Sequence, residues 1–247
     1  MNPQKDAYGQ EVLAYLEGRP SFEIVERDDG HVAPSGGAAA YFADYKDWPT
    51  EQKKAIKFAK GACLDVGAGA GRVSLYLQSK GMDVVAIDNS PLAIKVCKKR
   101  GVKKAKVLPI EKITQLQPKK FQSIIMFGNN FGLFGGFKKA QRLLKQMHKI
   151  TTPDARIISE NADPYNTTDS DHLFYHQFNK KRGRMPGQLR IRIRFKKYKG
   201  DWFDYLLVSP TELKKILAGT GWHIKKLIPS KTFMYYAIIE KDPTSKQ

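Results

Sequence analysis

The chain of 247 residues is long enough for one large domain, or for one domain that carries an insertion. Hydrophobic residues make up 41% of it, which suffices for a sizeable core, and no apolar run approaches the roughly 18 to 20 residues that span a bilayer. The formal net charge of +19 favours an anionic partner without defining the fold; it arises beyond residue 60, because residues 1–60 carry 8 basic and 10 acidic side chains.

The N-terminus is polar and lacks the apolar stretch of a secretory signal. Two cysteines are present, Cys63 and Cys97, and neither has the spacing of a metal ligand. Both are expected to be reduced thiols in apolar or helical surroundings. These features predict a cytoplasmic protein without a membrane segment.

Residues 1–60 are expected to form a lid, because a loop at Pro34–Gly37 precedes an aromatic segment at Tyr41–Trp48. From residue 61 to 161, short apolar runs alternate with helical patterns, which favours βαβ units and a parallel sheet buried on both faces. The predicted strands are 62–66, 83–87, 105–108, 123–127 and 156–159, and the predicted helices are 72–80, 91–100 and 137–150.

Residues 162–208 are predicted to be a small β-rich cap inserted after the fifth strand. The stretch 163–185 is polar and turn-rich, whereas 188–198 alternates apolar residues with basic ones, which is the two-residue period of a strand. A turn at Gly200–Asp201 would return the chain into a partner strand at 202–208.

Residues 209–247 are predicted to complete the α/β core. Ser209 and Glu212 have the spacing of a capping box at a helix start, and two strands at 222–227 and 232–240 follow. The expected fold is therefore α/β and doubly wound, with a mostly parallel seven-stranded sheet, helices on both faces and the small β-rich cap.

The first predicted strand runs into a glycine-rich turn and then into a helix, in the sequence LDVGAGAGR from Leu64 to Arg72. Glycines allow the backbone to turn tightly and to approach a ligand, and the start of the helix offers N–H groups to polar or anionic atoms. This arrangement is typical of a site for a nucleotide-like cofactor.

Asp88 ends the second predicted strand, 21 positions after Gly67, where a carboxylate can accept hydrogen bonds from both hydroxyl groups of a ribose. A dinucleotide site prefers the spacing G-x-G-x-x-G, but here Gly67, Gly69 and Gly71 form G-x-G-x-G and Arg72 stands where the third dinucleotide glycine would be. The spacing disfavours a dehydrogenase, which would bind NAD instead.

At about residues 61–161 the chain resembles the class I S-adenosylmethionine-dependent methyltransferases. The resemblance implies that the glycine loop lines the methionine part of S-adenosylmethionine, with Asp65 near its amino group, and that Asp88 binds the ribose. The segment Val107–Ile113 would contact adenine, although Pro109 stands where the family usually has an acidic residue. The cofactor-binding candidates are Asp65, Gly67, Ala68, Gly69, Gly71, Arg72, Asp88, Asn89, Ile110, Glu111, Phe127 and Asn129.

The resemblance also implies that the segment Phe121–Gly136 ends at the reacting methyl group. Its sequence GNN is either a plain strand-to-helix turn or a source of amide groups, from Asn129 or Asn130, for the cofactor or substrate. No Pro-Pro follows the asparagines, unlike in the amino-directed nucleic-acid methyltransferases, and neither cysteine is placed to attack a pyrimidine ring. Two nucleic-acid chemistries are therefore disfavoured.

His172 and His176 lie four residues apart and would share one face of a helix. This pair lacks the H-E-x-x-H pattern and an obvious third ligand, so no metal is expected. One of them, or Tyr165, Tyr175 or Asp163, could line the acceptor pocket and act as a general base; surface or hinge histidines are the alternative. The catalytic candidates are Asn130, Tyr165, His172 and His176.

The basic strand from Arg190 to Lys197 has two interpretations. Its arginines could bind phosphate or carboxylate groups, or they could form the solvated face of a hairpin and discourage edge-to-edge aggregation. We favour the second, because no aromatic residues interleave with the arginines on the same face.

The combined prediction is a methyltransferase that transfers a methyl group in line from S-adenosyl-L-methionine to a small-molecule acceptor, for which the basic charge suggests an anion. An RNA methyltransferase that uses the basic cap face is less favoured, and a noncatalytic S-adenosylmethionine-binding regulatory protein is a third alternative. The acceptor, the accepting atom and the oligomeric state are not specified by these patterns.

Overall fold

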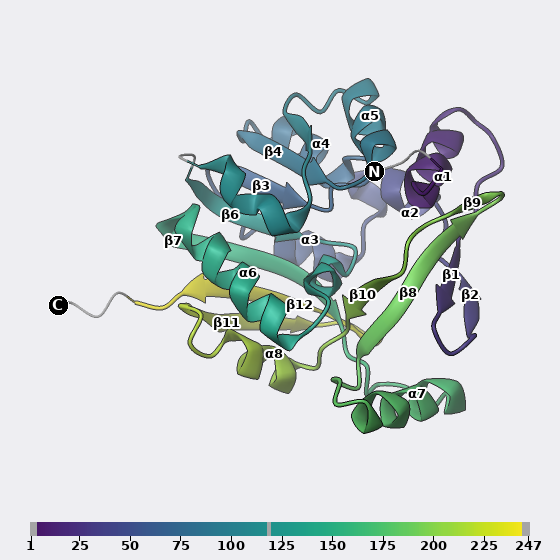
Figure 1. Cartoon of the computed structure of the whole chain (residues 1–247). Helices are drawn as coiled ribbons and strands as arrows, with labels where there is room; N and C mark the ends of the chain where they lie inside the picture. The colour runs from purple at the N-terminus through teal and green to yellow at the C-terminus, as the bar shows by residue number, and fades with distance from the viewer. Residues whose placement is uncertain (1–3, 118–119, 244–247) are drawn as a thin grey trace. The chain divides into compact units, whose positions relative to one another are not determined.

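The computed structural model describes residues 4–117 and 120–243, so the first three residues of the predicted lid and the last four of the predicted C-terminal segment lie outside it. The predicted α/β fold with a mostly parallel seven-stranded sheet is confirmed (Figure 1), with the strand order β11-β12-β7-β6-β3-β4-β5. Neighbours β4 and β5 are parallel, as are β6 and β7, whereas β12 is antiparallel to both β7 and β11. The strands are β3 (Cys63–Val66), β4 (Val84–Asp88), β5 (Ala105–Val107), β6 (Phe121–Met126), β7 (Thr151–Ala162), β11 (Trp222–Pro229) and β12 (Met234–Lys241).

A second, smaller sheet has the order β10-β8-β1-β2, with β9 also paired to β8. Its strands are β1 (Ile24–Arg27), β2 (Val32–Pro34), β8 (Gln188–Phe195), β9 (Tyr198–Lys199) and β10 (Phe203–Leu206). The helices are α1 (Ala7–Leu16), α2 (Ala39–Phe42), α3 (Thr50–Ile56), α4 (Arg72–Ser79), α5 (Pro91–Lys99), α6 (Phe137–Lys149), α7 (Ser170–Lys181) and α8 (Pro210–Leu217), with shorter 3-10 turns η1 (Tyr45–Asp47), η2 (Ile110–Leu116) and η3 (Asn130–Phe134).

The chain forms two compact units. The first unit holds the residues up to Trp48 together with Asp65–Ile110 and Arg190–Phe203. The second holds Pro49–Leu64, Glu111–Leu189 and the residues from Asp204 onward. Each unit is described by itself below.

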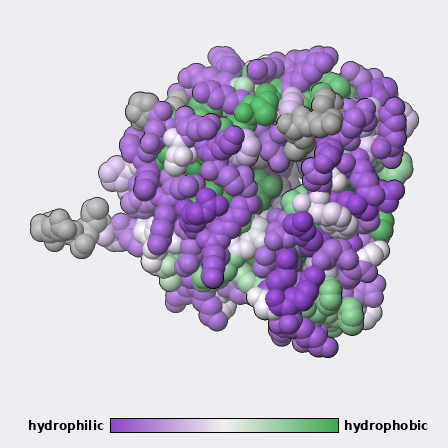
Figure 2. All heavy atoms as spheres, in the orientation of Figure 1, coloured by the Kyte–Doolittle hydropathy of each residue, from purple (hydrophilic) through white to green (hydrophobic). Residues whose placement is uncertain are grey.

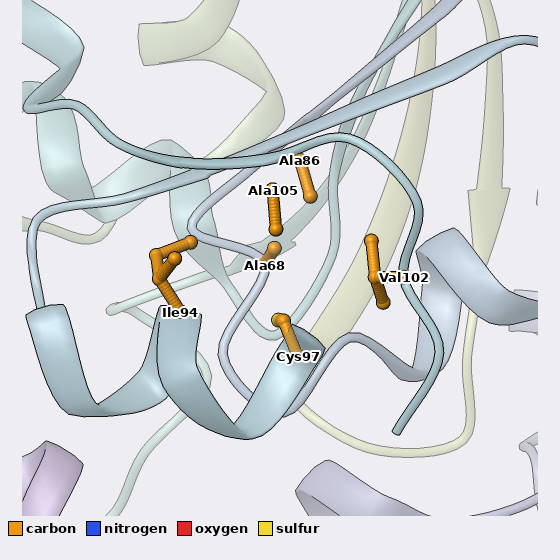
Figure 3. Close-up of a cluster of buried hydrophobic side chains, with 6 residues drawn as sticks. All are labelled: Ala68, Ala86, Ile94, Cys97, Val102 and Ala105. Atoms are coloured by element: carbon orange, nitrogen blue, oxygen red, sulfur yellow. The ribbon is translucent and has the colours of Figure 1, made fainter. Parts of the chain in front are cut away.

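In the first unit, α5 packs on β4 and β5 through a cluster of small buried side chains. Figure 3 shows these side chains, which come from the glycine loop, β4, α5, the connection after α5 and the start of β5. Small residues let helix and sheet approach closely, and the thiol of Cys97 donates a hydrogen bond to the carbonyl oxygen of Gly69 at 3.0 Å. The cluster comprises Ala68, Ala86, Ile94, Cys97, Val102 and Ala105.

Helix α1 lies against α5, and their N-termini are joined by Asp6. The carboxylate of Asp6 caps α1 by accepting from the amide of Gly9 at 3.0 Å, and it also accepts from the Ser90 hydroxyl at 2.9 Å. Ser90 in turn caps α5, as its hydroxyl accepts from the amide of Ala93. One buried carboxylate therefore fixes the start of both helices.

The predicted hairpin in the cap has a different turn. Strand β8 ends at Phe195, and the chain turns at Lys196, which has a positive φ of 51°, so that Phe195 pairs with Tyr198. The prediction of a turn at Gly200–Asp201 was therefore wrong. The other edge of β8 pairs with β1, where Glu26 lies directly opposite Arg192. This pairing of opposite charges across two distant segments stabilises the small sheet, and no local pattern indicates it.

In the second unit, α3 contacts β7, β11 and β12, while α6 contacts β7 and α8. The stretch predicted as polar and turn-rich contains the helix α7, which begins after Asp169 because that side chain accepts from the amides of Asp171 and His172. The described residues contain no helix that is long and apolar enough to cross a membrane. Figure 2 shows that hydrophilic residues cover most of the visible face, as the high net charge requires.

The predicted capping box at the start of α8 is confirmed. The Ser209 hydroxyl accepts from the amide of Glu212, and the Glu212 carboxylate accepts from the amide of Ser209 at 3.0 Å. We expect Ser209→Ala to lower the free energy of unfolding by about 1 kcal/mol, because one amide at the helix start loses its acceptor. Urea titration measures this loss. Thr211→Ala, at an exposed position of the same helical turn, is the matched control, and equal stabilities of the two variants would contradict the assignment.

Candidate functional site

The glycine loop of the first unit follows β3 and requires glycine at three positions. Gly67, Gly69 and Gly71 have φ values of 70°, 55° and 81°, a region that side chains other than glycine rarely adopt. Helix α4 begins after Gly71, which as a glycine has no side chain to cap the helix, and the amide of Ser74 in its first turn donates to the carboxylate of Asp65. A helix start is a place where backbone N–H groups can donate to polar or anionic atoms of a ligand.

Asp88, at the end of β4, holds the glycine loop in place. One carboxylate oxygen accepts from the amide of Gly69 at 3.0 Å, and the other accepts from the amide of Ser90 at 2.9 Å. Burial raises the pKa of Asp88 to about 6. The amide of Asn89 also donates to this carboxylate. A carboxylate has about four acceptor positions, so these bonds do not take all of them and a ligand hydroxyl can donate as well. Asn89, the next residue, is exposed.

Asp65 joins β3 to α4 rather than facing solvent. Its buried carboxylate accepts from the Ser74 hydroxyl at 2.7 Å, and burial raises its pKa to about 6. The guanidinium group of Arg72 lies 4.7 Å from the ring centre of Trp48, so this side chain packs on the N-terminal aromatic segment. Asp65 and Arg72, which were both predicted to bind the cofactor, therefore also make contacts within the protein.

The segment after β5 contains the candidates for adenine binding. Val107 has 49% of its surface exposed, which leaves an apolar side chain uncovered beside the end of β5. Ile110 is buried and is the last residue of this part of the first unit. Glu111 belongs to the second unit, where its carboxylate forms an ion pair with Lys139 at 2.6 Å. Its pKa is lowered even though burial opposes this, because Lys139 donates to the carboxylate.

In the second unit, Asn129 acts as a turn residue after β6. It adopts a positive φ of 58°, its side-chain oxygen accepts from the amide of Ala162 at 3.0 Å, and its carbonyl oxygen accepts from the Tyr205 hydroxyl at 2.7 Å. These contacts favour the plain-turn interpretation for Asn129. Asn130 is half-buried and begins η3, and Phe127 is buried with its ring edge-on to Tyr236.

Glu160 lies beside this turn and was missed by the sequence patterns. One of its carboxylate oxygens accepts from the amide of Gly128 at 2.7 Å and from the side-chain amide of Gln52 at 2.8 Å. Glu160 lies near the end of β7. Its position as a carboxylate near the end of a predicted strand was the signal in the sequence that could have identified it.

The catalytic candidates on and near α7 separate into two places. The buried His176 lies 5.7 Å from the Tyr165 ring, centre to centre, and the Tyr165 hydroxyl donates to Glu212 at 2.8 Å. Burial and the Glu212 carboxylate raise the pKa of Tyr165, so this phenol stays protonated at neutral pH and is a poor base. His172 instead approaches the Thr167 hydroxyl at 3.4 Å. Across residues 4–117 and 120–243, no three His, Cys, Asp or Glu side chains are grouped so as to hold a metal ion.

Tyr8 of α1 is a further residue of the first unit that the sequence patterns missed. Its hydroxyl group lies over Gly69, where a Cβ atom would overlap with it. Val12, one turn later, packs with Ala70 and Val96, which keeps α1 on the glycine loop. Asp6 before a helical apolar pattern was the signal that could have placed this helix.

Gly69→Ala is expected to destabilise the fold, because the new methyl group overlaps with the Tyr8 hydroxyl and the positive φ adds about 1 kcal/mol. Adding Tyr8→Phe should restore part of the loss, since the next ring atom, Cζ, lies 3.7 Å from the new Cβ. Denaturant titration of the wild type, both single variants and the double variant gives the interaction free energy between the two substitutions. Purely additive losses would contradict the contact.

A family model described as a methyltransferase domain matches residues 64–159, which include the glycine loop, Asp88 and the end of β6. Among curated proteins, none matches the chain. A solved structure of a SAM-dependent methyltransferase from Bacteroides fragilis, in complex with S-adenosyl-L-homocysteine, is 26% identical to it. That match covers 98% of each chain with a TM-score of 0.82.

Other solved structures share the fold at lower identity. The CcbJ methyltransferase from Streptomyces caelestis is 14% identical, over 81% of this chain and 95% of that chain, with a TM-score of 0.60. The 1,6-didemethyltoxoflavin-N1-methyltransferase from Burkholderia thailandensis, with bound 1,6-didemethyltoxoflavin and S-adenosylhomocysteine, is 15% identical over 81% of each chain, with a TM-score of 0.51.

Proposed function

We propose that this chain, which belongs to the class I S-adenosylmethionine-dependent methyltransferases, transfers a methyl group to a small-molecule acceptor. The observation that supports this most is the glycine loop held by Asp88, because it places a helix start with a glycine N-cap beside a buried carboxylate. S-adenosyl-L-methionine is the methyl donor. Its ribose hydroxyls would donate to Asp88, and its methionine part would follow Gly67, Ala68 and Gly69.

The bound donor supplies an electrophilic methyl group on a positively charged sulfur. A nucleophilic atom of the acceptor forms the new bond to this methyl group, and the methyl–sulfur bond breaks with its electron pair going to sulfur. The protein contributes positioning and the exclusion of water, and it accepts a proton where the nucleophile carries one. In the second unit, Asn130 and the buried His176 are the proposed acceptor-side residues, since Tyr165 is a poor base.

The small-molecule acceptor is favoured over RNA by the charges of the small sheet. Arg192 donates to Glu26 at 2.8 Å and Arg194 approaches the same carboxylate at 3.4 Å, so part of the basic strand is neutralised within the protein. In addition, the B. thailandensis relative binds a small molecule. We also propose a cytoplasmic location, because Cys63 and Cys97 are both buried and form no disulfide with each other.

Calorimetry with S-adenosyl-L-methionine tests the proposal, with NAD as the control ligand. We expect the protein to bind S-adenosyl-L-methionine and not NAD. Binding of NAD instead would indicate a dehydrogenase. Transfer of radiolabelled methyl groups to a panel of small amines, phenols and carboxylic acids then tests for activity. RNA affinity that falls steeply with salt, together with methylation of RNA, would instead support the RNA alternative. Cofactor binding without methylation of either class would indicate a regulatory protein.

A further inference from the structure

The outward face of helix α6 in the second unit carries a row of cations. Between residues 138 and 149, all the exposed side chains of this helix are basic, and they are Lys138, Arg142, Lys145 and Lys149. Steps of four, three and four residues place them on one face, opposite the buried residues of the helix. Hydrophilic residues gather over α6, which faces the viewer in Figure 2.

This row of cations is not neutralised within the protein. Among residues 4–117 and 120–243, no carboxylate forms an ion pair with any of the four side chains. Glu111, whose pKa Arg142 helps to lower, is paired instead with Lys139 at 2.6 Å. Together with Gln141 and Gln146, the four cations line a hollow on the surface of the helix. A ligand in this hollow would meet four positive charges that have no internal counterpart.

The positive charge works against the stability of α6 itself. Like charges four residues apart repel one another on a helix, and Lys138 stands in the first turn, where the helix dipole disfavours a cation. No acidic residue stands in that turn. Helix α8 has the usual arrangement, with Glu212 in its first turn and its lysines in the last. The pattern on α6 is therefore not one that helix stability selects.

The residue types on this face favour phosphate groups over other anions. Lysine and arginine bind phosphate oxygens, and glutamine amides donate to them as well. A membrane surface or an acidic protein would use apolar or aromatic side chains as anchors, and none of the exposed residues from 138 to 149 is of that kind. From Lys138 to Lys149 the row is about 16 Å long at 1.5 Å per residue, which spans several phosphates of one strand.

We propose that this face of α6 binds the phosphate backbone of a single strand of nucleic acid without reading its bases. The row supplies positive charge but no aromatic side chain on which a base would stack, so the contacts are independent of sequence. The inference goes beyond the proposed function, because binding of the strand requires no methyl transfer.

Fluorescence anisotropy with a labelled oligouridylate of about 20 nucleotides tests this proposal on the full chain. The first variant replaces the whole row by glutamine, as Lys138→Gln, Arg142→Gln, Lys145→Gln and Lys149→Gln together. The matched control removes the same charge from four exposed lysines of the first unit, as Lys95→Gln, Lys98→Gln, Lys99→Gln and Lys103→Gln together.

The wild type should bind the oligonucleotide, and four phosphate contacts should make its affinity fall roughly 50-fold between 50 and 200 mM salt. At 50 mM salt the α6 variant should bind at least about tenfold more weakly than the wild type, and its affinity should depend less on salt. The control variant should stay within about threefold of the wild type, because its charges lie outside the proposed face.

Urea titration checks folding, and the α6 variant should be at least as stable as the wild type, because the repulsion within the helix is relieved. A variant that keeps the charges should bind like the wild type; it combines Lys138→Arg, Arg142→Lys, Lys145→Arg and Lys149→Arg. Equal losses in the α6 variant and the control would mean that net charge alone attracts the strand, and the proposal would be wrong. It would also be wrong if the wild type bound polyglutamate or phosphatidylserine vesicles but not the oligonucleotide, or if it bound none of them.

Discussion

Replacing Asp88 by asparagine should lower the affinity for S-adenosyl-L-methionine by at least about tenfold while the protein stays folded. Hydrogen bonds to a charged acceptor are worth about 1 kcal/mol more than those to a neutral one, and 1.4 kcal/mol corresponds to a factor of ten in affinity. Asparagine keeps one side-chain oxygen, which can still accept from the buried amide of Gly69 or Ser90. Calorimetry measures the affinity.

Asp88→Ala separates the two roles of this carboxylate. Alanine leaves the amides of Gly69 and Ser90 without their acceptor, which costs about 1–3 kcal/mol each if they stay buried. The alanine variant should therefore lose stability as well as affinity, whereas the asparagine variant loses mainly affinity. Undiminished binding by Asp88→Asn and by a folded Asp88→Ala would remove Asp88 from the cofactor site.

The glycine loop could be predicted from the sequence because its geometry is encoded locally. Positive φ angles at Gly67, Gly69 and Gly71 are needed by consecutive turns, and these angles select glycine regardless of the rest of the chain. Asp88 could be found for the same reason, since it ends a short apolar strand. The order and spacing of such signals determine the main sheet.

Features that depend on distant segments could not be predicted. The pairing of Glu26 with Arg192 joins residues that are 166 positions apart, and the β8 hairpin turn is set by this sheet rather than by a glycine. The sequence allowed Asn129 to be either a turn residue or a hydrogen-bond donor to a ligand. Its positive φ and its contact with Ala162 favour the turn, and neither can be read from the sequence. Glu11 was missed because glutamate is rarely buried, so its residue type predicts an exposed helix face.

Glu11 on α1 is buried beside Glu23, with 0% and 2% of their surfaces exposed, and it should make stability depend on pH in a direction that is unusual for a carboxylate. The pKa of Glu11 is raised from its ordinary 4.5 to about 8, so the unfolded chain releases this proton first. Its contribution to stability is fully present below about pH 4.5, and it is lost as the pH rises through about 8. One pKa unit corresponds to about 1.4 kcal/mol, so the loss is on the order of a few kcal/mol.

Urea titrations of the wild type and of Glu11→Gln at pH 5 and pH 8.5 isolate this contribution. Asp65 and Asp88 also have raised pKa values, near 6, and they titrate with the same sign in both proteins, so the difference between the proteins removes them. The pKa of Glu23 is raised by burial and depends on Glu11, so its titration is part of the measured difference. Glu11→Gln should gain stability relative to the wild type as the pH rises. The control Glu17→Gln should show no such gain, because Arg19 lowers the pKa of Glu17 and the carboxylate is already charged at both values. If the wild type instead became more stable relative to Glu11→Gln between pH 5 and pH 8.5, the raised pKa of Glu11 would be contradicted.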